Sequence, residues 1–136
     1  MSLRRPVWVV GGVFALLVFL VLVVVKVAGR LGPECVNDVR QVVDSPDGRK
    51  KIVVFSRNCG ATTGFSTQVS ILESMQTLPD QGGNAFIADK GTAKVSWKAN
   101  GDILVLLDPG VRVFKKERTV SGVSIEYRDQ RKDPEP

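Results

Sequence analysis

The segment from Cys59 to Gln68 carries the side chains best suited to bind or attack another molecule. It reads Cys-Gly-Ala-Thr-Thr-Gly-Phe-Ser-Thr-Gln and places four hydroxyl groups and two glycines within ten residues. Hydroxyl groups and accessible backbone amides suit an anionic or sugar-like ligand. The alternative is that the glycines serve turn conformations and the threonines cap their own backbone. The candidate binding residues are Arg57, Thr62, Thr63, Ser66, Thr67 and Gln68.

The same hydroxyl groups have little support as catalytic nucleophiles. Thr62, Thr63 or Ser66 would each need a general base. The chain contains no histidine, and its carboxylates show neither catalytic nor metal-ligand spacing. Arg57 or a lysine would have to act instead, so a serine or threonine hydrolase is the minor alternative to a protein without enzymatic activity. Two thiols without histidine are a poor zinc site, so we expect no metal and no cofactor.

Cys35 and Cys59 are the only cysteines, and hairpin geometry indicates that they form a disulfide. The segment Ser45-Pro46-Asp47-Gly48-Arg49 is typical of a three-residue hairpin loop with Gly48 in the left-handed conformation. The loop's flanking residues then face each other, so opposed residue numbers in an uninterrupted ladder add up to 94, as those of the two cysteines do. The alternative is two buried free thiols. A disulfide in so small a domain suits an oxidising compartment.

From Val36 onward the sequence is typical of β-strands. The first four predicted strands are residues 36–43, 49–57, 65–72 and 85–88. The third alternates apolar and polar residues as a half-exposed strand does. Asn100-Gly101 is a strong two-residue hairpin signal that makes Ala99 face Asp102. We expect an all-β domain of about eight antiparallel strands in two meanders, forming a sandwich or a strongly bent sheet.

The chain from Val7 to Val25 carries no charged residue and no proline. At about 1.5 Å per residue it spans about 28 Å, close to the roughly 30 Å hydrocarbon core of a bilayer. We therefore expect a retained transmembrane helix rather than a cleavable signal peptide, whose apolar core is shorter. The predicted domains are a cytoplasmic leader (1–6), the transmembrane helix (7–28), an extracytoplasmic β domain (31–128) and a disordered tail (129–136).

Charge excludes one class of partner. The chain has a formal net charge of +5, but four of its 19 basic residues (Arg4, Arg5, Lys26 and Arg30) flank the apolar run. The remaining 15 are almost balanced by 14 acidic residues. A nucleic-acid-binding protein concentrates positive charge on its folded domain. We therefore expect no nucleic acid, and predict the lipid bilayer and an envelope protein as partners.

Three segments together form a recognisable pattern: Ser45-Pro46-Asp47-Gly48, Val53-Val54-Phe55, and the run from Arg57 through Cys59-Gly60-Ala61-Thr62-Thr63 to Leu72. This pattern resembles an uncharacterised family of small bacterial proteins that carry an N-terminal hydrophobic segment or a lipid anchor. The resemblance implies architecture and location, and no activity.

The sequence thus predicts a single-pass protein of the bacterial inner membrane whose C-terminal domain lies in the periplasm or outside the cell. The absence of catalytic groups favours a binding or interaction module that holds another envelope component. The alternative is an inhibitor or immunity protein acting in the envelope. A hydrolase of wall or lipid substrates is a lesser alternative.

Overall fold

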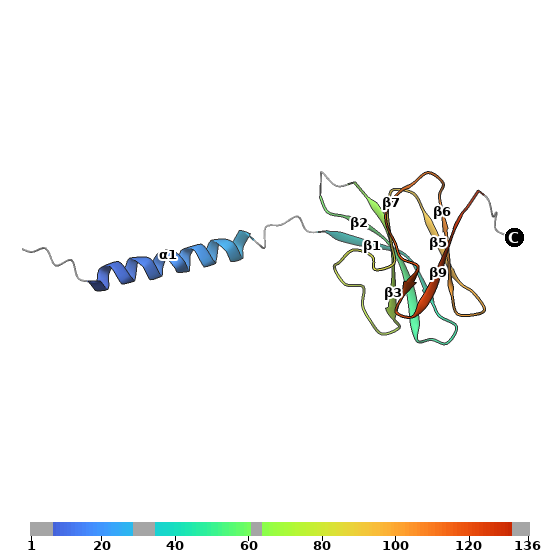
Figure 1. The fold of residues 1–136 in the computed structure, drawn as a ribbon, viewed down its shortest axis with the longest axis horizontal. Coiled ribbons are helices and arrows are strands. Elements are labelled where there is room, and N and C mark those ends of the chain that lie inside the picture. The colour runs from blue at the N-terminus through green and yellow to red at the C-terminus, as the bar shows by residue number, and fades with distance from the viewer. Residues whose placement is uncertain (1–6, 29–34, 61–63, 132–136) are drawn as a thin grey trace, which may run out of the picture. The chain divides into compact units, whose positions relative to one another are not determined.

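The structure of the chain is a computed structural model that describes residues 7–28, 35–60 and 64–131. The chain divides into two units, Met1–Glu34 and Cys35–Pro136. The first contains the helix α1 (Val7–Ala28), and the second is all β (Figure 1). The strands are β1 (Val36–Asp44), β2 (Lys50–Asn58), β3 (Ser66–Glu73), β4 (Phe86–Asp89), β5 (Ala93–Trp97), β6 (Ile103–Leu107), β7 (Arg112–Lys116), β8 (Thr119–Val120) and β9 (Val123–Asp129).

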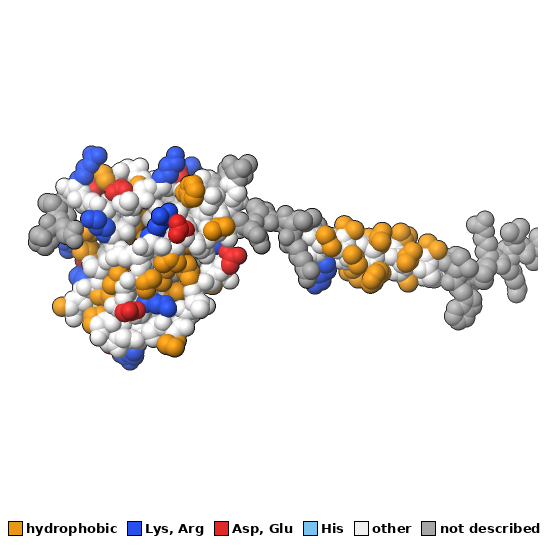
Figure 2. All heavy atoms as spheres, turned by 180° about the vertical axis from the view of Figure 1, so that it is seen from behind, with side chains coloured by type: hydrophobic (Ala, Val, Ile, Leu, Met, Phe, Trp, Pro, Cys, Tyr) orange, Lys and Arg blue, Asp and Glu red, His pale blue; other side chains and the backbone are white. Residues whose placement is uncertain are grey.

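The helix α1 does not have the predicted role. Its side chains are described for residues 11–27, where exposed hydrophobic groups cover much of the surface (Figure 2). A helix that crosses the hydrocarbon core needs about 20 predominantly apolar residues. Within the described part of the chain, no helix combines the length and the apolar character needed to cross a membrane. The predicted transmembrane helix is therefore wrong. The predicted leader (1–6) and residues 132–136 of the predicted tail lie outside the described residues.

The β unit consists of two sheets, which confirms the all-β prediction. The first sheet has the order β1-β2-β3-β4-β7, and the second has the order β5-β6-β9-β8. The prediction of eight strands in two antiparallel meanders is wrong. After the turn at residues 108–111, β7 joins the first sheet beside β4, which leaves β6 to pair with β9 in parallel. Turn residues indicate that the chain reverses, but they do not indicate which sheet the next strand joins.

A hydrophobic core fills the space between the two sheets. The first sheet contributes Ile52, Val54, Val69, Ile71, Phe86 and Ala88, and the second contributes Ala93, Val95, Ile103, Val105, Leu107 and Ile125. We call the face of the first sheet that meets this core its inner face. A smaller cluster of Val53, Phe55 and Leu72 lies on the opposite, outer face, where Leu78 packs against it. The strand β2 is therefore buried on both faces.

The first hairpin differs from its predicted register. The Ser45 N–H donates to the Lys50 carbonyl at 2.8 Å, so the loop contains four residues rather than three. The Asp47 carboxylate accepts hydrogen bonds from the Ser45 hydroxyl at 2.6 Å and from the Arg49 N–H at 3.1 Å, and these bonds hold Arg49 within the loop. Near the turn, opposed residue numbers consequently add up to 95.

A β-bulge restores the register at the cysteines. The pairing shifts by one residue between Val39 and Gln41, and from Val39 outward opposed residue numbers add up to 94. Cys35 and Cys59 therefore face each other and form a disulfide with an S–S distance of 2.02 Å. The disulfide prediction is confirmed, while the uninterrupted ladder on which it rested is wrong.

The hairpin between β5 and β6 shows a similar shift. The Lys98 N–H donates to the Asp102 carbonyl at 2.8 Å, so the loop has three residues and Lys98, not Ala99, faces Asp102. The Asn100 side-chain oxygen accepts the Asp102 N–H at 3.2 Å, which draws Asn100 into a local side-chain turn. The expected pairing of Ala99 with Asp102 is wrong for this reason.

Candidate binding site

The predicted binding residues are divided between the two faces of the first sheet. Successive side chains of a strand point to opposite faces. In β3, Val69 and Ile71 belong to the core between the sheets, so Thr67 shares the inner face. Ser66 and Gln68 point to the outer face. Thr62 and Thr63 lie outside the described residues. The predicted set therefore does not form a single site.

The outer face is covered by residues 74–84, which we call the cover loop. Gln68 is only 4% exposed, and its side-chain oxygen accepts the Gly83 N–H at 2.6 Å. The Gln68 amide donates to the Ser66 hydroxyl at 2.8 Å, and that hydroxyl donates to the Arg57 carbonyl at 3.1 Å. Ser66 and Gln68 thus hold backbone in place. The prediction that this strand is half exposed is wrong, because the cover loop buries its polar side chains.

Asn84 attaches the end of the cover loop to β3. Its side chain accepts the Ile71 N–H and donates to the Ile71 carbonyl, both at 2.8 Å, as a neighbouring strand would. The Asn84 N–H donates to the hydroxyl of Ser70, which is 3% exposed. At Gly83 an added Cβ would lie 2.7 Å from the Phe86 carbonyl oxygen, so this approach needs glycine. The cover loop is therefore closely fitted to the outer face.

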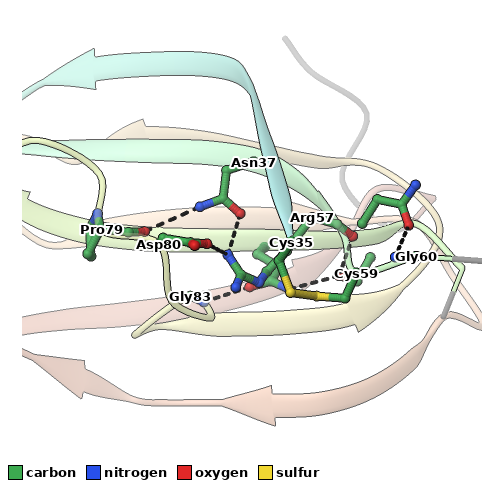
Figure 3. Close-up of a disulfide and its surroundings, with 11 residues drawn as sticks. Cys35, Asn37, Arg57, Cys59, Gly60, Pro79, Asp80 and Gly83 are labelled. Atoms are coloured by element: carbon green, nitrogen blue, oxygen red, sulfur yellow. Dashed lines mark hydrogen bonds and ion pairs between the residues drawn. A yellow bond between two sulfur atoms is a disulfide. The ribbon is translucent and has the colours of Figure 1, made fainter. Parts of the chain in front are cut away.

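Arg57 also attaches the cover loop to the first sheet, near the disulfide. Figure 3 shows its guanidinium pointing toward Asn37 and Asp80, whose side-chain oxygens accept hydrogen bonds at 2.6 and 2.8 Å. The Arg57 side chain is only 12% exposed. Asn37 in turn donates to the Pro79 carbonyl at 3.2 Å. Arg57 therefore ties β1, β2 and the cover loop together rather than facing an open site.

Thr67 lies in a different environment, on the inner face of the sheet. A partly open groove of about 580 Å³ lies where the bulge of β1, residues 54–56 of β2 and the start of β3 approach the turn between β4 and β5. This volume falls within the roughly 300–1,000 Å³ of small-molecule sites. The residues that line the groove are Arg40, Val54, Phe55, Ser56, Phe65, Thr67, Lys90, Gly91, Thr92 and Ala93. Of the predicted binding residues that the structure describes, Thr67 alone lines it.

The turn that forms one wall of the groove is fixed from several directions. The Thr67 hydroxyl donates to the Gly91 carbonyl at 2.6 Å. The Thr92 N–H and hydroxyl donate to the Asp108 carboxylate at 2.7 and 3.0 Å. Gly91 has a φ of +79°, and an added Cβ would lie 2.6 Å from the Val111 side chain. The wall is therefore firmly attached to β3 and to the end of β6.

Lys90 occupies a strained position in this turn. Its φ is +54°, a left-handed conformation that costs an L-residue about 1–2 kcal/mol and that Asn, Asp or Gly usually adopts. The turn therefore tolerates a lysine where its backbone favours another residue. Strained residues of this kind are concentrated at functional sites. Ser121 has a similar φ of +50°, so the strain alone does not distinguish Lys90. Lys90 is a candidate functional residue because it combines this strain with a place in the groove lining.

The groove is basic. Arg40 and Lys90 both line it, and no acidic side chain is among its described lining residues. Arg40 pairs with Asp38 at 2.9 Å, but both side chains are 61% exposed, and such surface pairs contribute little. Within the described residues, Lys90 has no ion-pair partner. The groove therefore presents positive charge beside an apolar lining.

The shifted pKa values have structural causes outside the groove. The Ser45 hydroxyl and Arg49 hold the pKa of Asp47 well below its usual range in the first hairpin loop. Hydrogen bonds from Lys98 and Arg128 lower the pKa of Glu126. Burial raises the pKa of Tyr127 to about 12, and its hydroxyl donates to the Glu117 carbonyl at 2.8 Å. Among the described residues, no group of three or more potential metal ligands occurs.

Of the ten residues that line the groove, only Thr67 was predicted from the sequence. The others include Arg40 and Lys90, which carry its charge, and the exposed Phe65. The dipeptide Lys90-Gly91 is a turn signal, but its place beside β3 depends on long-range packing. No protein-family model matches the chain, and comparison with curated proteins and with solved structures found no match. The resemblance drawn from the sequence pattern therefore stays a prediction.

Proposed function

We propose that the β unit is an extracytoplasmic binding module of the bacterial envelope that holds an anionic, amphipathic envelope component in its groove. The observation that carries this proposal is the groove itself, which combines an apolar lining with Arg40 and Lys90. Apolar pockets with a few well-placed polar groups are the usual form of small-molecule sites.

The disulfide supports a place outside the cytoplasm. Cys35 and Cys59 link the two strands of the first hairpin, and structural disulfides persist mainly in oxidising compartments. The link also holds β1, which carries Arg40, against β2 at the end where the groove lies. The predicted compartment and the proposed site are therefore consistent with each other.

The hydrogen bonds of the Ser66 and Thr67 hydroxyl groups do not favour catalysis. Thr67 donates to a backbone carbonyl, and Ser66 does the same on the outer face. A nucleophile needs a base that accepts its proton, whereas a backbone carbonyl only orients the hydroxyl. We therefore propose a non-enzymatic role.

The proposed function is tested by filling the groove with a large side chain. The full chain with Ser56→Trp, which places a large ring on the inner face, is purified from the bacterial envelope beside the wild type and Ser96→Trp. Ser96 is an exposed serine of β5 and provides a matched control. We expect mass spectrometry to find an anionic component retained by the wild type and the control and lost from Ser56→Trp.

A second groove variant controls for the case in which Ser56→Trp misfolds. Lys90→Glu changes an exposed side chain and reverses its charge, and we expect it to lose the same component. Equal retention by the wild type and both groove variants would refute the proposed site. An envelope protein as partner stays a prediction of the sequence, and a toxin retained through the groove would identify the inhibitor alternative.

A further inference from the structure

We infer that the ligand of the groove is a single alkyl chain that ends in an anionic head group, either a carboxylate or a phosphate monoester. This inference rests on the proposed function and defines the chemical class of its ligand. It depends on which polar groups of the groove are already paired, on the shape of the apolar lining, and on the positions of the two basic residues.

Most polar groups of the groove wall are bonded within the protein. The Thr67 hydroxyl bonds to Gly91, both donors of Thr92 bond to Asp108, and the Lys90 N–H donates to the Phe65 carbonyl at 3.4 Å. A bound peptide or sugar would lose hydration from many polar groups and would find few new partners here. Burying a polar group without a hydrogen-bond partner is unfavourable. An alkyl chain has no such groups, so the groove favours it.

The lining offers apolar contact. Val54 and Ala93 belong to the core of the unit, and Phe65 stands beside them with 62% of its surface exposed. An aromatic side chain this exposed gains free energy when a ligand covers it, because burial removes apolar surface from water. A chain lying against these three residues would provide that cover.

The two cations belong to separate elements. Arg40 is the extra residue at the β1 bulge, and Lys90 lies in the left-handed turn position. Both are long, exposed side chains whose charged ends stay in water while their stems cover apolar surface. They fit an anionic head at the open side of the groove, with the chain directed inward.

The test is a calorimetric titration of the purified full chain with three amphiphiles: dodecanoate, dodecyl phosphate and dodecyltrimethylammonium. We expect both anions to bind at least tenfold more tightly than the cation. Each methylene added to or removed from the carboxylate should change affinity about fourfold, as burial of a methylene predicts. The tighter of the two anions identifies the head group, and either result supports the inference.

Charge variants test the roles of the two basic residues. We expect Lys90→Gln to weaken dodecanoate binding about tenfold and Arg40→Gln several-fold, since each removes one charge facing the carboxylate. The matched control is Arg49→Gln, which removes an exposed arginine from the first hairpin loop and should leave affinity unchanged.

Three results would overturn the inference: equal affinity for the cation and the anions, affinity independent of chain length, or no effect of Lys90→Gln. If any of these results occurred while Ser56→Trp still released an envelope component, the ligand class would be wrong and the proposed function would stand. If Ser56→Trp and Lys90→Glu also retained that component, both proposals would fail.

Discussion

The two faces of the first sheet carry similar polar side chains that hold other segments of the chain, but one face is covered and the other is left partly open. On the outer face, Gln68 and Ser70 are buried and bonded to the cover loop. On the inner face, the Thr67 hydroxyl fixes a turn that leaves a groove open beside it. The comparison shows that residue type does not decide between a structural and a binding role. What decides it is whether another segment of the chain covers the face.

The largest effect on the free energy of unfolding is expected at the disulfide, which joins the two strands β1 and β2 of the first sheet. Replacing Cys35 and Cys59 together by serine should lower the free energy of unfolding by about 3 kcal/mol, because the unfolded chain loses a closed loop of about 25 residues. Equilibrium urea unfolding measures this change. A reductant should destabilise the wild type and leave the double variant unchanged, and equal stability of the two proteins would contradict the prediction.

The next largest effect on the free energy of unfolding is expected on the outer face, which the cover loop buries. Asn84→Ala should lower the free energy of unfolding by about 2 kcal/mol, because it leaves the Ile71 N–H and carbonyl without their partner. Gln76→Ala, on an exposed residue of the same loop, is the matched control and should change stability by less than about 0.5 kcal/mol. If the two variants were equally stable, the cover loop would not be held as described.

A smaller effect is expected on the open face. Thr67→Val keeps the shape of the side chain and removes the hydroxyl that holds Gly91, so we expect a loss of about 1 kcal/mol in the free energy of unfolding. Retention of the envelope component should fall as well, because the wall of the groove loosens. Thr119→Val in the exposed strand β8 should affect neither measurement. If Thr67→Val lost stability but retained the envelope component fully, the turn held by Thr67 would not contribute to binding.

The smallest effect is expected at Asp47, on neither face. Its folded-state pKa lies below its unfolded value of about 3.9, so its contribution to stability is complete above that pH and is lost as the pH falls toward the folded pKa. Asp47→Asn should therefore lower the urea midpoint near pH 6 and have progressively less effect as the pH approaches 2. A difference that grew on acidification would contradict the assigned direction of the shift.

Local patterns predicted much of the β unit, because strand alternation and turn residues act over short distances. Ile52, Val53, Val54 and Phe55 are all apolar, and β2 is indeed buried on both faces. The cysteine pairing was also predicted, although the four-residue loop and the bulge at Arg40 each displace the register by one residue and compensate each other. Such small shifts depend on side-chain hydrogen bonds that the sequence pattern does not reveal.

The candidate site was less accessible to prediction. The segment from Cys59 to Gln68 is rich in hydroxyl groups, but alternation along β3 places Ser66 and Gln68 on the covered face and Thr67 in the groove. Lys90 reaches the groove from a turn more than 20 residues away. Long-range contacts of this kind depend on which sheet each strand joins, and turn signals do not specify that choice. The predicted transmembrane helix is wrong for a different reason: within the described part of the chain, no helix is long and apolar enough to cross a membrane.

The central claim is that the inner face binds a ligand and the outer face does not. The most direct test is an amide ¹H–¹⁵N NMR titration of the full chain with dodecanoate. We expect the shift changes to concentrate at Ser56, Thr67 and the turn from Lys90 to Ala93, with Ser70 and Asn84 unchanged. Changes centred on the cover loop, or spread evenly over both faces, would contradict it.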